Sequence, residues 1–273
     1  MTSRSSPAPV TSGPEVLAAR LGDLPLERIV LGLDFDGTLA PIVVDPDKAK
    51  PDRDTLALLE RLACRLLRLV LISGRDSDLL WERVPIPNTL LIGNHGLEER
   101  RDGVSRLSAQ AQPYADNLLH AADALASIAA ATGPGIRIEQ KRASIGVHFR
   151  QSPDPQASGA QLGESLSALA GQEHLRLFRG RYVWELRPAV EVNKGTVVAG
   201  LAGSLHPAGL IYVGDDVTDA DAFRAMRDLP NVRTLAVGVR SAEVPTETFD
   251  ACDLVVDGVE GVKTLLADLL AVR

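Results

Sequence analysis

The chain has 273 residues, of which 45% are apolar, and its formal net charge is −7. This length suits one large domain or two modest domains. The acidic balance argues against binding of nucleic acid or of an anionic membrane through a basic face, although a local pocket can still be positive. No apolar run approaches the roughly 18 residues of a membrane span, and no signal peptide pattern precedes the first predicted domain, so a cytoplasmic protein is expected.

The sequence predicts a disordered amino-terminal tail and two reduced cysteines. Residues 1–14 are rich in Ser, Pro and Thr, which predicts a disordered tail. Cys64 and Cys252 each stand beside apolar residues. This context favours two reduced core thiols over a disulfide.

Apolar runs alternate with amphipathic segments at both ends of the chain. Continuous apolar runs of four or five residues are typical of strands buried on both faces of a parallel sheet. The predicted strands cover residues 29–33, 69–72, 90–92, 210–213, 234–237 and 254–256. The predicted helices cover residues 14–23, 52–68, 194–201, 220–227 and 259–270.

The middle of the chain has a different pattern. Helices are predicted over residues 114–131 and 161–170, with paired strands at 136–140 with 144–150 and at 175–178 with 182–186. Antiparallel strands with helices form an α+β module. We therefore expect an α/β parallel-sheet core made of residues 15–104 and 187–273, with an α+β domain inserted at residues 105–186. Ligands of such cores bind beyond the carboxyl ends of the strands.

Two aspartates follow the first predicted strand directly. Asp34 and Asp36 alternate along an extended segment, so both side chains can point into one pocket. One carboxylate can attack a phosphoryl group, and the other can protonate the leaving oxygen. Gly37 permits the sharp turn that such a loop needs. A solvated turn is the competing interpretation.

Three further polar groups follow other predicted strands or begin a helix. Ser73, with Gly74 and Arg75, can hold a phosphate oxygen, although this tripeptide can also be a plain turn. Lys194 begins a helix, where it can offset phosphate charge or simply face solvent. The acidic cluster after residue 214 is costly without a cation and suits Mg²⁺, with an acidic capping turn as the alternative. Its members are Asp215, Asp216 and Asp219.

Together, in this order, the four groups resemble the haloacid dehalogenase superfamily of phosphatases, with a Rossmann-like core and an inserted cap. The resemblance implies that Asp34 is the nucleophile and a Mg²⁺ ligand. It implies that Asp36 is the general acid and base, with its backbone carbonyl on the metal. Ser73 and Lys194 would bind the phosphoryl group. Asp215 would ligate Mg²⁺ directly, with Asp216 and Asp219 in supporting positions.

Four segments around the insertion are similar to the trehalose-6-phosphate phosphatase family within that superfamily. Residues 93–96 read GNHG and are followed by Glu98, and residues 138–141 read IEQK with HFR at 148–150. Residues 184–188 read WELRP with NKG at 193–195, and residues 214–223 read GDDVTDADAF. The resemblance covers residues 29–257 and implies hydrolysis of trehalose 6-phosphate in trehalose biosynthesis.

The same resemblance implies the residues that bind the substrate. The cap residues implied to bind sugar are Glu139, Lys141, Arg150 and Glu185, and the further substrate-binding residues are Arg75, Asn94 and Asn193. Carboxylates accept from sugar hydroxyls, while Lys and Arg donate to sugar oxygens. Glu139 and Lys141 alternate along one predicted strand and would face the same side.

Other functions remain open from the sequence. The same core could act on sucrose phosphate or glucosyl-3-phosphoglycerate, or bind a sugar phosphate as a regulator without catalysis; a phosphomutase is less expected. Retention of Asp34, Asp36, Lys194 and Asp215 argues against the regulator. The expected partner is a small sugar phosphate, and any functional coupling would be to a separate trehalose-6-phosphate synthase. Neither nucleic acid nor membrane is expected to bind.

Overall fold

A computed structural model describes residues 13–43, 48–241 and 244–271. Its chain contacts divide it into two units. The first comprises Met1–Ser73, Leu79–Leu91 and Asn193–Arg273, and the second comprises Gly74–Asp78 and Ile92–Val192. Of the predicted tail, residues 1–12 lie outside the described residues, and residues 13 and 14 begin a helix.

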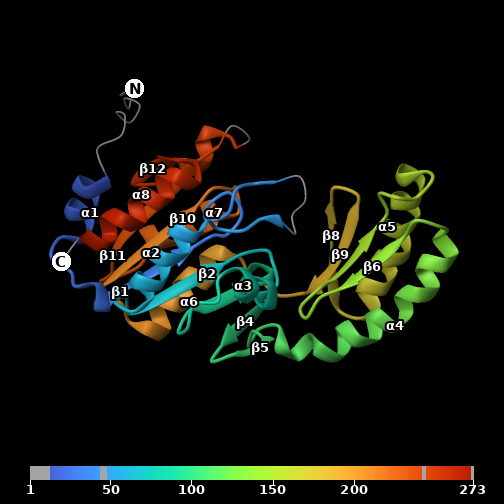
Figure 1. Ribbon diagram of the computed structural model, residues 1–273. Helices are drawn as coiled ribbons and strands as arrows, with labels where there is room; N and C mark the ends of the chain where they lie inside the picture. Colours follow the sequence, from blue (N-terminus) through green and yellow to red (C-terminus); the bar gives the residue numbers. More distant parts are fainter. Residues whose placement is uncertain (1–12, 44–47, 242–243, 272–273) are drawn as a thin grey trace, which may run out of the picture. The chain divides into compact units, whose positions relative to one another are not determined.

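The first unit is built on a parallel sheet. Five of its strands run in the order β12-β11-β10-β1-β2 and pair in parallel (Figure 1). The chain adds β2 on one side of β1 and returns later to add β10 on the other side. The strand order therefore reverses at β1 and β10, the place where open α/β sheets bind ligands. The bounds are β1 (Ile29–Leu33), β2 (Arg68–Ile72), β3 (Leu90–Gly93), β10 (Gly209–Gly214), β11 (Arg233–Arg240) and β12 (Leu254–Asp257).

Helices cover both faces of this sheet. Leu31 and Ile211 pack on one face in a cluster with leucines of α1, α2 and α8. Tyr212 points to the opposite face, where its ring meets Phe223 of α7 edge-on with centroids 5.9 Å apart. Strands covered on both faces explain the uninterrupted apolar runs. The helices are α1 (Gly13–Leu21), α2 (Arg53–Ala63), α3 (Ser77–Arg83), α6 (Lys194–Leu205), α7 (Asp219–Arg227) and α8 (Gly258–Ala271).

The second unit contains an antiparallel sheet of four strands in the order β6-β7-β9-β8. Alternate residues such as Val147 and Leu186 pack against leucines of α4 and α5, so the two helices cover one face (Figure 1). A hairpin of β4 and β5 also belongs to this unit. The elements are β4 (Glu98–Arg101), β5 (Val104–Leu107), α4 (Ala115–Thr132), β6 (Arg137–Gln140), β7 (Ile145–His148), α5 (Pro155–Gln172), β8 (Leu175–Gly180) and β9 (Val183–Pro188).

The two largest errors among the predicted helix boundaries concern α2 and α5. The helix expected over residues 52–68 ends at Ala63, because the chain turns there and the Leu67 amide donates to the Ile29 carbonyl at 3.0 Å. The helix expected over residues 161–170 begins at Pro155, because the Asp154 carboxylate caps its first amides. The prediction also lacked α3 and the β4–β5 hairpin.

The cysteines are free, as predicted, but only one is sheltered. Cys64 is exposed, which corrects the expectation of two core thiols. Burial, with the nearby Asp253 charge, raises the pKa of Cys252 to about 12. Among the described residues, no helix combines the length and apolar character needed to cross a membrane.

Candidate active site

The loop after β1 places Asp34 at the switch point of the sheet. The Asp34 amide donates to the Val213 carbonyl at 2.9 Å, which ties the loop to the end of β10. Gly37 has φ 77°, and a β-carbon there would lie 2.0 Å from Asp215 Oδ2. Only glycine allows both this backbone conformation and this approach. The Asp34 side chain is buried, whereas Asp36 is half-buried.

Asp219 is held by four donors at the start of α7. Its Oδ1 accepts from Lys194 Nζ and from the Tyr212 hydroxyl, each at 2.6 Å. Its Oδ2 accepts from the backbone amides of Asp215 at 3.1 Å and Asp216 at 3.0 Å. An ionised carboxylate has about four acceptor positions, so those of Asp219 are filled. Asp219 therefore fixes the acidic loop and the lysine.

Lys194 bridges the two acidic segments. Its Nζ lies 2.9 Å from Asp34 Oδ1 and 2.6 Å from Asp219 Oδ1, and its side chain is 3% exposed. Asn193 caps α6: its side chain accepts from the Thr196 amide, and Thr196 reaches back to the Asn193 amide. This capping box fixes the first turn of the helix and thereby directs Lys194 to the carboxylates.

The site holds more negative than positive charge. Burial raises the pKa of Asp34 well above its usual range, and Asp219 and Asp215 add to the effect although Lys194 opposes it. Burial and the Asp219 charge raise the pKa of Asp215 to about 6. Burial would lower the pKa of Lys194, but Asp34 and Asp219 raise it above its usual range. One lysine therefore leaves these carboxylates short of compensating charge.

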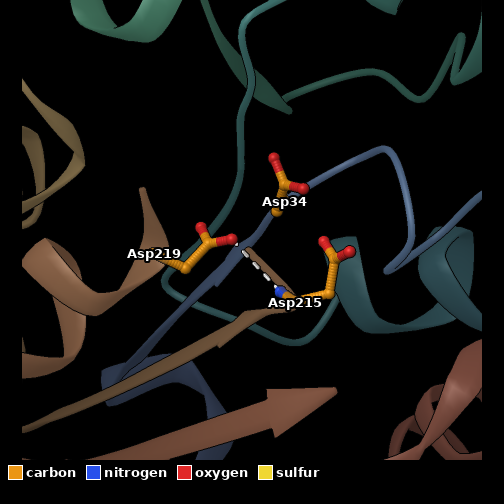
Figure 2. A group of neighbouring side chains, drawn as sticks. All are labelled: Asp34, Asp215 and Asp219. Atoms are coloured by element: carbon orange, nitrogen blue, oxygen red, sulfur yellow. Dashed lines mark hydrogen bonds between the residues drawn. The ribbon is translucent and has the colours of Figure 1, made fainter. Parts of the chain in front are cut away.

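These carboxylates fit a hard divalent cation. Oxygens of Asp34, Asp215 and Asp219 lie within 4.8 Å of one another, and all three residues are buried (Figure 2). Mg²⁺ takes oxygen ligands and needs only one or two carboxylates beside phosphate and water. Since Asp219 is saturated by its four donors, Asp34 and Asp215 are the members with oxygens left for a metal.

The predicted site residues are divided between the two units. Asp34, Lys194 and Asp215 meet in the first unit, and Ser73 is buried there just beyond the end of β2. Asn193 also belongs to this unit, as the cap of α6. The predicted residues of the second unit are Arg75, Asn94, Glu139, Lys141, Arg150 and Glu185.

The face of the second unit's sheet that points away from α4 and α5 carries a row of four residues, one from each strand. Glu139 pairs with Gly146, Gly146 with Glu185, and Glu185 with Phe178. Because side chains alternate along strands, all four face away from α4 and α5. Gly146 has no side chain, and a β-carbon there would lie 3.2 Å from His148 Nε2 and 3.7 Å from Val183 Cγ2.

Neighbouring donors hold both glutamates of this row. Glu185 Oε2 accepts from Arg187 at 2.5 Å and its Oε1 from Ser144 at 2.7 Å. Burial would raise the pKa of Glu185, but Arg187, Ser144 and the Lys141 charge together lower it, so the carboxylate is ionised. Glu139 Oε2 lies 2.7 Å from His148 Nε2.

The exposed end of this sheet holds Arg150. Its guanidinium lies 5.2 Å from the centroid of the Tyr182 ring and is exposed, unlike the groups around Glu185. Tyr182 adopts φ 62°, a left-handed conformation that is unusual for an aromatic residue. Arg150 therefore stands apart from the Glu139–Glu185 row, at the β8–β9 turn.

Sequence reasoning missed several residues of these two sites. Tyr212, which donates to Asp219, stands in an aliphatic strand, where a buried hydroxyl must find a partner; that requirement was the available signal. Glu98 was noted in the family pattern without a role; it is fully buried and accepts from the Ser77 amide, and burial raises its pKa. Thr38 donates to Asp215 at 3.4 Å. Ser144, beside Glu185, carries no sequence signal of its own.

The family model and the relatives that match this chain belong to the same family. The family model described as Trehalose-phosphatase matches residues 32–252. The trehalose-phosphate phosphatase of Mycobacterium avium (strain 104) is 36% identical over 203 residues, covering 72% of this chain and 51% of the relative. A probable trehalose-phosphate phosphatase 4 of Oryza sativa subsp. japonica is 30% identical over 253 residues, covering 90% and 66%. The chain thus spans about half to two thirds of these relatives' length.

Solved structures agree with the fold. The Aspergillus fumigatus trehalose-6-phosphate phosphatase (crystal form 3) matches with a TM-score of 0.67 and 26% identity, covering 98% of this chain and 100% of that one. A haloacid dehalogenase-like hydrolase from Bacteroides thetaiotaomicron matches with a TM-score of 0.63 at 15% identity, which bears on the fold alone. The chain therefore has the α/β fold of haloacid dehalogenase-like hydrolases.

Proposed function

The chain belongs to the trehalose-phosphatase family, and from this we propose that it hydrolyses trehalose 6-phosphate to trehalose and phosphate. One observation carries the proposal. Lys194 is buried between Asp34 and Asp219 at the switch point of the sheet, with Asp215 beside them. This arrangement concentrates a nucleophile, a fixed cation and metal-binding oxygens where a phosphoryl group can be neutralised.

The reaction follows from the chemistry of these side chains. A carboxylate oxygen of Asp34 attacks the phosphorus, and the bond from phosphorus to the sugar oxygen breaks. Asp36 gives its proton to the departing sugar oxygen. Asp36 then takes a proton from water, whose oxygen attacks the aspartyl-phosphate and restores the Asp34 carboxylate. Lys194 and Ser73 hold the phosphoryl oxygens throughout.

Mg²⁺ is the proposed cofactor. Asp34 and Asp215, together with the backbone carbonyl of Asp36, would hold it. When bound, it neutralises charge on the phosphoryl oxygens and on the crowded carboxylates. Asp219 keeps Lys194 and the amides of Asp215 and Asp216 in place, as the supporting position of the sequence prediction requires.

Sugar recognition is assigned to the second unit. Glu139 and Glu185 lie on either side of Gly146 and can accept from sugar hydroxyls, while Lys141 can donate to sugar oxygens. A site of such polar groups rejects ligands that leave those groups unpaired. We keep Arg150 among the proposed sugar-binding residues, with residues 105–186 as the proposed cap domain. Arg75, Asn94 and Asn193 complete the proposed substrate-binding set.

The test is phosphate release by the purified protein with Mg²⁺, using trehalose 6-phosphate, sucrose 6-phosphate, glucose 6-phosphate and glucosyl-3-phosphoglycerate, with an EDTA control. We expect a strong preference for trehalose 6-phosphate that EDTA removes. Preference for another sugar phosphate would reject the substrate assignment and keep the mechanism. Release from none of them would favour a binding protein without catalysis. A cytoplasmic location and coupling to a separate synthase stay predictions.

A further inference from the structure

Three polar side chains of the second unit, Asn94, Ser144 and Glu185, lie within hydrogen-bond distance of one another in that order. Ser144 Oγ lies 2.7 Å from Glu185 Oε1 and 3.4 Å from Asn94 Oδ1. The far oxygen of Glu185 accepts from Arg187. Asn94 is 3% exposed, and its Nδ2 has no hydrogen-bond partner among the described residues.

The hydrogen-bond donors and acceptors of these three side chains do not match in the orientation shown for Asn94. A serine hydroxyl has one proton to donate and lone pairs with which to accept. Glu185 Oε1 is the closer acceptor and belongs to an ionised carboxylate, so it takes the proton. Asn94 Oδ1 then faces a hydroxyl oxygen with no proton to share, while Nδ2 of the same amide stays unpaired. Both groups are left without a partner in a buried place, which is costly.

Turning the Asn94 amide by 180° removes the mismatch. Nδ2 then donates to Ser144 Oγ, and the hydroxyl passes its own proton to Glu185. The amide oxygen takes the buried position that Nδ2 held, where it is an acceptor with no partner among the described residues. The direction of every hydrogen bond from Asn94 to Glu185 is thereby fixed.

The backbone around Asn94 also marks this place as functional. Asn94, His95 and Gly96 have φ 48°, 56° and 105°, so three consecutive residues are left-handed. The Asn94 amide donates to the Arg75 carbonyl at 2.9 Å, which holds the loop in this conformation. Such strain is retained where the neighbouring structure enforces it, and it clusters at ligand sites.

We propose that Ser144 is a positioning residue of the sugar site, which donates to Glu185, accepts from the Asn94 amide and thereby presents Asn94 Oδ1 to a sugar hydroxyl. This inference rests on the proposed function for the identity of the ligand. The Ser144 hydroxyl bonds to the two residues that it orients, and the Ser144 carbonyl accepts from the Lys141 amide at 2.9 Å. Its loss should therefore affect recognition of the sugar and leave the phosphoryl chemistry intact.

The kinetic test compares Ser144→Ala with Ser152→Ala, a second buried serine of the same unit that pairs with Ser158 instead. For Ser144→Ala we expect kcat/KM on trehalose 6-phosphate to fall about 10- to 100-fold, the usual effect of losing a hydrogen bond to a charged group. The rate on 4-nitrophenyl phosphate should stay within about twofold. Ser152→Ala should leave both rates unchanged, and Ser144→Thr, which keeps the hydroxyl, should recover most of the loss.

The loss of kcat/KM in Ser144→Ala should overlap with the loss in Asn94→Ala. Because the two residues act as one unit, the Asn94→Ala and Ser144→Ala losses should not add in the double variant. Fully additive losses, or equal losses on both substrates, would overturn the proposal. If Ser144→Ala melts several degrees lower, Ser144→Cys, with its weaker donor, replaces it in the same comparison.

A second readout does not depend on the substrate. The Glu185 carboxyl is titrated by ¹³C NMR in the unmodified protein and in Ser144→Ala. Arg187 and Lys141 also act on this carboxyl and are unchanged, so losing the Ser144 proton should raise the pKa of Glu185. An unchanged titration would overturn the proposal. Failure of the protein to hydrolyse trehalose 6-phosphate would reject the proposed function, and this titration would still decide the role of Ser144.

Discussion

The two polar clusters of the molecule differ in how far neighbouring donors compensate the charge of their carboxylates. In the first unit, Lys194 alone offsets the buried carboxylates around it, and Asp34 and Asp215 have raised pKa values. In the second unit, Glu185 has a donor on each oxygen and a lowered pKa. The first cluster is short of positive charge, which the proposed Mg²⁺ would supply, whereas the charge of Glu185 in the second is already compensated.

This difference separates chemistry from recognition. A site that stabilises transferring charge must hold groups that are incomplete without the substrate. A site that selects a polar ligand works through groups whose orientation is already fixed, so that a wrong ligand leaves them unpaired. The following four predictions test this division, from the largest expected effect to the smallest.

Asp34→Asn should remove turnover on every phosphate ester. The amide is a poor nucleophile, so kcat should fall about 10³-fold or more on both trehalose 6-phosphate and 4-nitrophenyl phosphate. Asp54→Asn on the exposed side of α2 serves as the matched control and should act like the unmodified protein. Near-normal rates for Asp34→Asn in steady-state assays would reject the covalent mechanism.

Lys194→Met should destabilise the first unit as well as inactivate it. Removing the lysine leaves Asp34 and Asp219 buried without their cation, and breaking such a buried pair costs about 3–5 kcal/mol in the free energy of unfolding. Urea unfolding without metal measures this loss. Lys263→Met, which removes a surface ion pair with Asp52 and Glu260, is the control and should change little. Equal stability of both variants would mean that the buried pair is not stabilising.

Gly146→Val should change selectivity without changing chemistry. The valine side chain would press on His148, which pairs with Glu139, and would stand between Glu139 and Glu185. We therefore expect kcat/KM on trehalose 6-phosphate to fall about 10-fold or more, a loss of about 1.4 kcal/mol in transition-state binding. Hydrolysis of 4-nitrophenyl phosphate should be little affected. Gly171→Val on α5, where a β-carbon meets no atom within 4 Å, controls for the added bulk. Parallel losses on both substrates would place the sugar elsewhere.

Metal affinity should depend on pH through Asp215. Its pKa is raised to about 6 without metal, so a proton occupies the carboxyl below that pH and competes with Mg²⁺. Calorimetric titration at pH 7.5, 6.5 and 5.5 should show affinity falling toward acid pH, approaching about tenfold per unit if one proton is displaced. The sign for stability is opposite. Since the folded pKa lies above the ordinary value, Asp215 disfavours the metal-free fold above pH 6 and does so less as pH falls. A pH-independent affinity would exclude Asp215 as a ligand.

Most of the sheet could be predicted because its strands are buried on both faces. The run at residues 29–33 gives β1 with its observed bounds. The end of α2 could not be predicted locally, since Leu66 and Leu67 continue the helical pattern while the Leu67 amide donates to the carbonyls of Leu26 and Ile29, far away in the sequence. The β4–β5 hairpin lacks apolar alternation, although Asp102-Gly103, both left-handed, is a recognised hairpin turn.

The candidate sites also contain residues that could be predicted from the sequence and residues that could not. Asp34, Lys194 and the acidic loop follow strand ends or begin a helix, so their convergence follows from the parallel topology. The alignment of Glu139, Gly146, Glu185 and Phe178 depends on the register of four strands that the sequence does not fix. Hydrogen-bond partners such as Ser144 can be found only once that register is known.

The central claim is that Asp34 carries the phosphoryl group during turnover. The most direct measurement is a rapid acid quench of the protein mixed with Mg²⁺ and trehalose 6-phosphate labelled at phosphorus, followed by mapping of the labelled peptide. We expect acid-stable, hydroxylamine-labile label on the peptide that contains Asp34, and none with Asp34→Asn. Label on another residue, or rapid phosphate release with no trapped label at any time, would contradict the mechanism.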